Sequence, residues 1–209
     1  RDGRLAIFGP ATGITDGHTL GAGWASRVLG VEMELIRKRA SHRVIAQGRH
    51  PIVGRLPNAL TYGDSHPYGP LLLPAEGALA AAHADELGLA TLSWAVNRPG
   101  LFVKDHGTHK VAWSASVPLP ANLLRELARW GGCHVWCDDD AVVLASESVA
   151  ALHAVKPGPY TLRLPSPRPV WDLLAERRLG GALDAIDLSI SPPETRLFYF
   201  GGEDPMAED

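Results

Sequence analysis

The sequence has no surplus of positive charge, no long apolar run and only two cysteines among its 209 residues. Its 20 lysines and arginines are outnumbered by 23 aspartates and glutamates, which gives a formal net charge of −3. A protein that holds a phosphate backbone needs a basic surface, so nucleic acid is not an expected partner. A membrane-spanning helix needs about 20 consecutive apolar residues. No stretch approaches that length, so no membrane partner is expected.

Glycine and proline, by contrast, are plentiful, with 22 glycines and 17 prolines in the chain. Both residues interrupt helices, so this content predicts many turns and short strands and excludes a helical bundle or a coiled coil. Apolar residues make up 45% of the chain and charged residues 21%. This balance is typical of a globular protein with one large domain or two small ones.

The two cysteines, Cys133 and Cys137, lie four positions apart. On a strand this spacing separates them by about 13 Å, at roughly 3.3 Å per residue, which is too far for a disulfide. Zinc would need a second pair of ligands, which is absent. We therefore expect two buried free thiols, no metal and no cofactor. The compartment stays open, with the cytoplasm as the favoured alternative.

Residues 1–132 alternate between strand and helix patterns, which predicts an α/β fold. The apolar run Leu5–Phe8 is typical of a central parallel strand that is buried on both faces. Leu20–Leu29 has helical spacing, and Ala121–Trp130 is the best helix, with Pro120 before it and Gly131 after it. Residues 48–74 look like a loop, and residues 76–87 stay ambiguous between helix and strand. Further strands are predicted at 31–36, 89–96, 101–103 and 110–115.

Residues 133–209 have a different pattern, in which short apolar runs alternate with turn signals. We predict a second domain, a small antiparallel β-sandwich with an acidic tail. The seven expected strands are His134–Trp136, Ala141–Ala145, Val149–Val155, Tyr160–Leu164, Val170–Leu173, Ile186–Ile190 and Arg196–Phe200.

The densest group of polar and aromatic residues is the expected loop from Tyr62 to Pro70. Asp64 and His66 occupy alternate positions and would point the same way on an extended segment. They can form a carboxylate–imidazole pair or half of a metal site. A turn held by side-chain hydrogen bonds is the favoured interpretation, and a surface cleft or subunit contact is the alternative. The candidate ligand or interface residues are Tyr62, Asp64, His66, Tyr68, Asn97 and Arg98.

The other motifs give weaker evidence of a functional site than the segment from Tyr62 to Pro70. His106 and His109 flank an expected hairpin turn, and zinc would need two further ligands from elsewhere. Asp16, between a strand and a helix, fits as the N-cap of that helix better than as part of a phosphate site. No Gly-x-Ser-x-Gly nucleophile elbow is present. We therefore assign no catalytic residue.

Five segments together resemble one known family. Leu5–Gly17 resembles a strand and loop of the glutamine-amidotransferase-like domain of family 42 β-galactosidases, where that domain is the trimerisation domain. His50–Pro57 is similar to a His-Pro-Ile…Gly-Leu-Pro stretch of the same superfamily, although Arg55 interrupts it. Pro99–Lys104 and the helix 123–130 resemble that domain's last strands and closing helix. Pro192–Phe198 resembles the small β-sandwich that follows.

The resemblance implies the later part of an amidotransferase-like (flavodoxin-like) domain at 1–132, incomplete at its N-terminus, and a β-sandwich at 133–209. In that family the catalytic acid and nucleophile lie on a preceding barrel, so no activity transfers to residues of this chain. The implied function is a non-catalytic assembly or accessory region of a glycoside-hydrolase-like protein. The implied partners are other copies, as in a trimer, or an upstream catalytic segment.

Two other functions stay open. Six tryptophans and four tyrosines can supply stacking surfaces for an independent carbohydrate-binding module. A hydrolase that uses Asp64 and His66 with residues of a partner chain is the third alternative. A further expectation concerns the strand Leu5–Phe8. Because a central strand has neighbours on both sides, we expect another polypeptide segment to supply one that this chain lacks.

Overall fold

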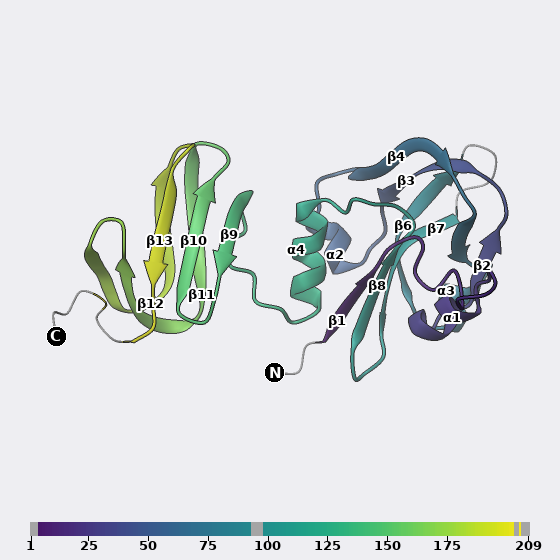
Figure 1. The fold of residues 1–209 in the computed structure, drawn as a ribbon, viewed down its shortest axis with the longest axis horizontal. Coiled ribbons are helices and arrows are strands. Elements are labelled where there is room, and N and C mark those ends of the chain that lie inside the picture. Colours follow the sequence, from purple (N-terminus) through teal and green to yellow (C-terminus); the bar gives the residue numbers. More distant parts are fainter. Residues whose placement is uncertain (1–3, 93–97, 203–204, 206–209) are drawn as a thin grey trace. The chain divides into compact units, whose positions relative to one another are not determined.

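The structure is a computed structural model that describes residues 4–92, 98–202 and 205. The chain divides into two compact units, Arg1–Cys133 and His134–Asp209, and each is described by itself. Strands hold 48% of the described residues and helices 13%, so the protein is mostly β (Figure 1). None of the described helices is long and apolar enough to cross a membrane.

The first unit is built on a six-stranded sheet with the strand order β1-β8-β7-β6-β3-β4. A separate two-stranded sheet joins β2 and β5, and the described part of the unit also contains four helices. The strands are β1 (Leu5–Phe8), β2 (Met33–Ile36), β3 (Ala40–Ala46), β4 (Thr61–Tyr68), β5 (Leu71–Pro74), β6 (Asp85–Leu92), β7 (Arg98–Asp105) and β8 (Lys110–Ser114). The helices are α1 (Gly23–Leu29), α2 (Pro51–Gly54), α3 (Ala78–Ala81) and α4 (Ala121–Trp130).

The strand pairing corrects the expectation of a parallel α/β sheet. Only β1 and β8 run parallel, and every other pair in the six-stranded sheet is antiparallel. An antiparallel pair needs no crossover helix between its two strands, so this sheet needs few such helices. The alternation of strands and helices that the sequence predicts is replaced by runs of consecutive strands. The amidotransferase-like architecture therefore has no support in this topology.

β1 lies at the edge of the sheet, where we expected a central strand. Among the described residues β8 is its only partner, and Ile7 is 39% exposed. The strands that are buried on both faces are the next two, β8 and β7. β1 and these two central strands each contain an uninterrupted apolar run, so the apolar character of a strand does not tell whether it lies at the edge or in the centre of the sheet. The expectation that another segment pairs with β1 stays a prediction.

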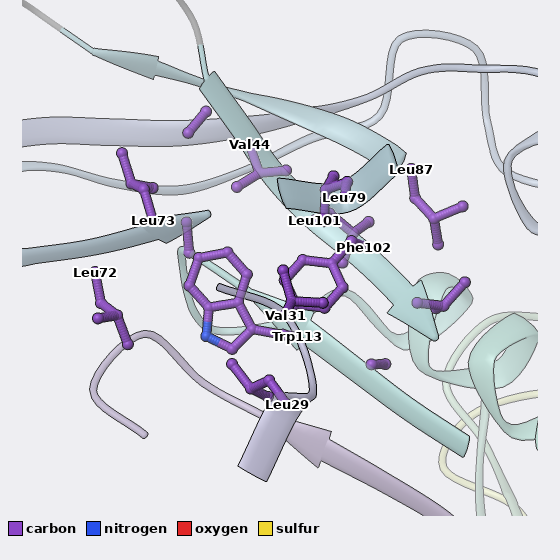
Figure 2. Packing of buried hydrophobic residues seen from close by; sticks show 14 of the residues in the cluster. Leu29, Val31, Val44, Leu72, Leu73, Leu79, Leu87, Leu101, Phe102 and Trp113 are labelled. Carbon is purple, nitrogen blue, oxygen red and sulfur yellow. The ribbon is translucent and has the colours of Figure 1, made fainter. Parts of the chain in front are cut away.

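The core of the first unit gathers around two aromatic rings on neighbouring strands (Figure 2). Phe102 on β7 stacks on Trp113 on β8 with the ring centroids 5.4 Å apart, and both are fully buried. Leu29 from α1 also belongs to this core. Burying large aromatic side chains contributes much of the hydrophobic stabilisation, so these residues hold α1 against the sheet.

Helix α4 begins and ends at the residues predicted from its sequence, Ala121 and Trp130. Leu123 and Leu127 lie four positions apart on one face and are fully buried, as an amphipathic helix requires. Lys110 Nζ donates to the Trp130 carbonyl at 2.7 Å, which places a positive charge at the negative end of the helix dipole.

Asp16 does not cap α1, which corrects our prediction. The helix begins at Gly23 after Ala22, and no side chain caps it. Asp16 Oδ1 instead accepts the backbone N–H groups of His18 and Thr19, both at 2.8 Å. A short Asp side chain satisfies a nearby turn as readily as a helix end, so the residue type alone does not decide between them.

The expected loop at 48–74 is also corrected, because it contains α2, β4 and β5. The ambiguous segment 76–87 divides into the short helix α3 and the start of β6. Gly63 and Pro67 gave residues 61–68 the composition of a loop, but pairing with β3 makes that segment a strand. Tertiary pairing thus overrides a weak local preference.

The second unit is a single five-stranded antiparallel sheet with the order β12-β11-β13-β10-β9. Its strands are β9 (Ala141–Ala145), β10 (Val149–Ala154), β11 (Gly158–Asp172), β12 (Arg177–Ile190) and β13 (Thr195–Tyr199). We predicted seven short strands in a sandwich. Two expected strands merge in the long β11, whose register against β12 shifts at three places, and His134–Trp136 is not a strand. Such irregularities bend long strands, so one sheet encloses its own core.

Neither Cys133 nor Cys137 forms a disulfide, and of the two only Cys137 is buried. Cys133 is exposed, which corrects the expectation of two buried thiols. Cys133 directly follows the turn that ends α4, whereas Cys137 pairs with Leu162 in an isolated β-bridge and packs in the core of the second unit.

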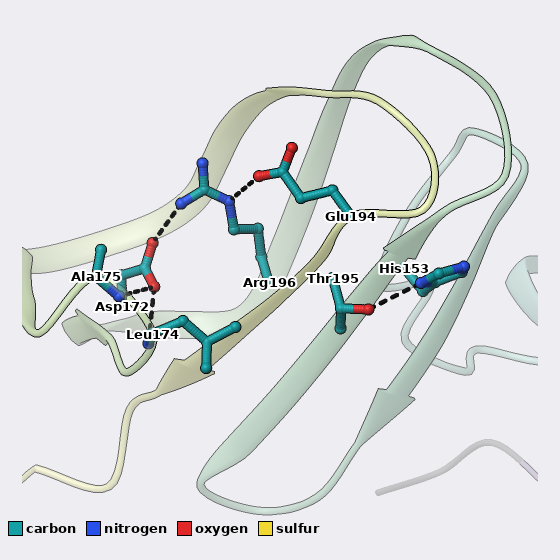
Figure 3. Close-up of polar contacts among 7 residues, drawn as sticks. All are labelled: His153, Asp172, Leu174, Ala175, Glu194, Thr195 and Arg196. Carbon is teal, nitrogen blue, oxygen red and sulfur yellow. Dashed lines mark hydrogen bonds and ion pairs between the residues drawn. The ribbon is translucent and has the colours of Figure 1, made fainter.

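A buried carboxylate organises the turn between β11 and β12 (Figure 3). Asp172 is 2% exposed, and its Oδ1 accepts the N–H groups of Leu174 and Ala175 at 3.2 and 3.1 Å. Its Oδ2 accepts from Arg196 Nη1 at 3.1 Å, and Arg196 Nε donates to Glu194 at 2.7 Å. Every oxygen of the buried charge is therefore satisfied, as burial demands.

Candidate functional site

The Asp64–His66 pair lies on a bulge of β4. Tyr68 is opposite Ala40 and Asp64 is opposite His42, so β4 has three residues where β3 has one between these pairs. Extra residues push a strand outward, and both side chains of the pair are exposed. Their Oδ1 and Nδ1 atoms lie 3.0 Å apart.

The electrostatics of this pair are local. The backbone N–H of His66 donates to the Asp64 carboxylate at 2.9 Å, and the imidazole is the second contact. These hydrogen bonds hold the pKa of Asp64 below its ordinary value, because they stabilise its charged form. The carboxylate thus completes a turn-like contact with its own strand.

The two tyrosines that flank the bulge have different environments. Tyr62 is buried, its hydroxyl lies 2.8 Å from Ser114 Oγ, and burial raises the pKa of its phenol. It therefore offers no exposed aromatic surface, which differs from our expectation for a ligand or interface residue. Tyr68 is half-buried, and its hydroxyl donates to the Ala115 carbonyl at 3.3 Å.

Tyr68 forms part of the wall of a small apolar pocket, called here the Tyr68 pocket. Its volume is about 280 Å³, and it lies between the turn after β4 and the loop before α1. The residues that line it are Pro10, Ala11, Ile14, Leu20, Tyr68, Gly69, Pro70, Leu71, Leu72 and Ala115. The end of the expected Tyr62–Pro70 loop thus lines a cleft, although Asp64 and His66 are not part of its lining.

Arg98 lines a larger cleft, called here the Arg98 cleft, with a volume of about 640 Å³. Glu76 and Glu86 are its acidic residues, and Leu79 and Pro99 are among its apolar ones. Burial raises the pKa of the Glu86 carboxyl. A cleft of this size, with a few converging polar groups and one perturbed carboxyl, has the features of a small-molecule site.

Arg98 itself has a structural task in this cleft. Its Nη2 donates to the Pro74 carbonyl at 2.5 Å and to Glu34 at 3.2 Å, so it ties β7 to the sheet of β2 and β5. Asn97, the neighbouring candidate, lies outside the described residues. The structure therefore separates the predicted site residues into three places: the β4 bulge, the Tyr68 pocket and the Arg98 cleft.

His106 and His109 stack with their ring centroids 4.6 Å apart. Burial, followed by the charges of His109 and Lys104, lowers the pKa of His106. Gly107 turns the chain between them with a φ of 79°, as the hairpin interpretation requires. Across the part of the chain that the structure describes, no three His, Cys, Asp or Glu residues are grouped to hold a metal ion.

Sequence reasoning missed Glu86 and the far wall of the Tyr68 pocket. Glu86 lies in the segment that stayed ambiguous, and its raised pKa depends on burial that no local pattern reveals. Pro10, Ile14 and Leu20 meet Tyr68 only through the fold. The one local signal was the density of proline and glycine in both loops, which indicates turns but not their contact.

No protein-family model and no curated protein sequence matches the chain. Solved structures do match. The chain is similar to a β-galactosidase from Bacillus circulans sp. alkalophilus, with a TM-score of 0.60, 14% identity, and coverage of 95% of this chain and 29% of that one. It is also similar to a GH42 β-galactosidase, with a TM-score of 0.50, 17% identity, and coverage of 94% of this chain and 28% of that one. A catalytic mutant of a GH42 β-galactosidase from G. stearothermophilus matches with a TM-score of 0.51, 18% identity, and coverage of 95% of this chain and 28% of that one.

These similarities concern the fold. Nearly all of this chain has the fold of a region of the β-galactosidases, and it spans under a third of the length of those enzymes. They support the expectation of a region like that of family 42 enzymes. The amidotransferase-like part of that expectation gains nothing from them.

Proposed function

We propose that this chain is a non-catalytic accessory region of a glycoside-hydrolase-like protein, which assembles with further copies of itself around an active site on another segment. The observation that carries the proposal is the pair of coverages, 95% of this chain against 29% of the β-galactosidase. A shared fold carries no activity by itself, so the likeness to one region of an enzyme supports a part in its architecture and does not transfer its chemistry.

The edge of the six-stranded sheet supports an assembly role. β1 is a short, wholly apolar strand with a partner on one side only among the described residues. A free edge of this kind presents unpaired backbone N–H and C=O groups that another strand can take up. Ile7, 39% exposed on this strand, adds apolar surface to the contact.

Sedimentation velocity of the full chain over a wide concentration range tests the proposal. We expect a defined oligomer, and we expect Ile7→Lys to shift it to smaller species, because a lysine on an edge strand opposes strand addition. Leu174→Lys is the matched control. It also replaces an exposed aliphatic residue, 62% exposed, but one in the turn between β11 and β12.

Hydrolysis of an aryl β-galactoside is measured on the same sample, and none is expected. A chain that stays monomeric throughout, or turnover that is lost when one of its own carboxylates is substituted, would refute the proposal.

The Arg98 cleft favours a second candidate function, an independent carbohydrate-binding module. A carboxylate and a guanidinium beside apolar residues can bind hydroxyl pairs of a sugar. Calorimetric titration with lactose tests this, with Glu86→Gln as the variant because Arg98 has structural contacts. Saturable binding that weakens in Glu86→Gln supports the carbohydrate-binding function. Absence of binding heat with both the wild type and the variant would exclude that function.

A further inference from the structure

Three large apolar side chains are exposed at intervals of four residues, Leu20 in the loop before α1 and Trp24 and Val28 on the helix itself. Leu20 is 45% exposed, Trp24 is 47% exposed and Val28 is 39% exposed. The buried face of the same helix carries Ala25 and Leu29. A helix that covers a core normally has polar residues on its outer face, so an apolar outer face marks an interaction surface.

This apolar face continues into the Tyr68 pocket. Leu20 is both exposed and part of the pocket lining. Ile14, another lining residue, accepts the backbone N–H of Gly21 at 3.0 Å, and Gly13 lies directly against the backbone of α1. The exposed face and the pocket therefore form one surface, called here the Trp24 surface.

Two guanidinium groups belong to this surface. Arg27 lies over the Trp24 ring, with its Cζ 4.1 Å from the ring centroid. Arg37 Nη2 donates to the Leu20 carbonyl at 3.4 Å. Neither arginine forms an ion pair with a carboxylate among the described residues, although the chain as a whole is acidic. Two cations beside exposed apolar groups favour a partner that brings negative charge.

The volume of the pocket limits what can enter it. Sites that enclose a whole small molecule usually measure about 300–1,000 Å³, and this pocket, at about 280 Å³, is smaller. It suits a single large side chain that anchors a longer segment. Trp and Arg are the residue types that most often dominate protein–protein binding energy, and both occur side by side here.

We propose that the Trp24 surface docks an acidic segment of a partner protein, with one large apolar side chain of that segment in the Tyr68 pocket. The carboxylates of the segment lie against Arg27 and Arg37, and its apolar residues cover Trp24 and Val28. This inference rests on the surface itself and does not depend on the proposed accessory function.

Fluorescence anisotropy with three labelled hexapeptides tests the proposal. The probe is Glu-Asp-Leu-Phe-Asp-Glu, which combines acidic and apolar residues. Lys-Lys-Leu-Phe-Lys-Lys reverses the charge, and Glu-Asp-Ala-Ala-Asp-Glu removes the anchor. We expect saturable binding of the probe only, and we expect added salt to weaken it because the arginines are exposed.

Variants of the full chain locate the binding. The double variant Arg27→Gln/Arg37→Gln is expected to weaken probe binding by about tenfold. The control Arg49→Gln removes another exposed arginine of the same unit and is expected to leave binding unchanged. Trp24→Ser tests the apolar part. The charge variants keep the test valid if Trp24→Ser does not fold, which far-UV circular dichroism shows.

Three results would overturn the proposal. The first is no saturable binding of the probe. The second is binding of a control peptide as tight as that of the probe. Equal binding of the basic peptide would show that apolar contact alone suffices, and equal binding of the alanine peptide would show that negative charge alone suffices. The third is a loss in Arg49→Gln as large as that in the double arginine variant.

Discussion

Asp172 gives the sharpest test of how the second unit is held together. Its buried carboxylate accepts two backbone N–H groups and one guanidinium N–H (Figure 3). Asp172→Asn keeps an oxygen for the two N–H groups but removes the charge that Arg196 contacts. Asp172→Ala removes all three interactions and leaves three donors without a partner.

The expected losses follow from these contacts. A hydrogen bond to a charged group contributes about 1.5–3 kcal/mol, so Asp172→Asn is expected to lower the free energy of unfolding by that amount. Asp172→Ala is expected to cost about 3–5 kcal/mol, as when one partner of a buried ion pair is removed. Glu194→Gln is the control. Glu194 is 40% exposed, and its contact with Arg196 is screened by solvent, so about 0–1 kcal/mol is expected.

Urea denaturation of the full chain, followed by circular dichroism and tryptophan fluorescence, measures these differences. The two units can unfold separately, so each transition is fitted by itself. We expect the loss in free energy of unfolding to be largest for Asp172→Ala, smaller for Asp172→Asn and smallest for Glu194→Gln. Two results would contradict the role given to the buried charge. One is an Asp172→Asn variant as stable as the wild type, and the other is a Glu194→Gln variant that loses as much free energy of unfolding as Asp172→Asn.

Three further predictions concern the first unit. Gly13→Ala is expected to cost more stability than Gly17→Ala in thermal melts, because both glycines have positive φ but only at the first would an added Cβ meet helix backbone, at 2.6 Å. Tyr62→Phe removes the hydrogen bond to Ser114 and is expected to cost about 1 kcal/mol in urea titrations. His106 has a lowered pKa, so its neutral form favours the fold and stability is lost as pH falls below 6.5. Stability curves between neutral and mildly acidic pH should therefore be flatter for His106→Gln than for the wild type, and an unchanged slope would contradict this.

The elements that could be predicted from sequence are those whose signals are local. α4 has a proline before it, a buried stripe at a spacing of four and a glycine after it, and its bounds match the prediction. The Asp64–His66 contact followed from alternate positions on an extended segment. In both cases the residues that decide the structure lie within a few positions of each other.

The elements that could not be predicted depend on distant partners. β4 is a strand because β3 pairs with it, and β1 is an edge strand because β8 alone pairs with it among the residues that the structure describes. Both facts are invisible in the composition of either segment. The Tyr68 pocket likewise needs two loops that are more than 40 residues apart to meet.

Native mass spectrometry of the full chain tests the central claim most directly. One chain has a mass of 22.4 kDa. An assembly region predicts a single dominant species at a small multiple of this mass, three times in a trimer, that dissociates in the Ile7→Lys variant. A mass of one chain at every concentration, with the variant indistinguishable from the wild type, would contradict the account.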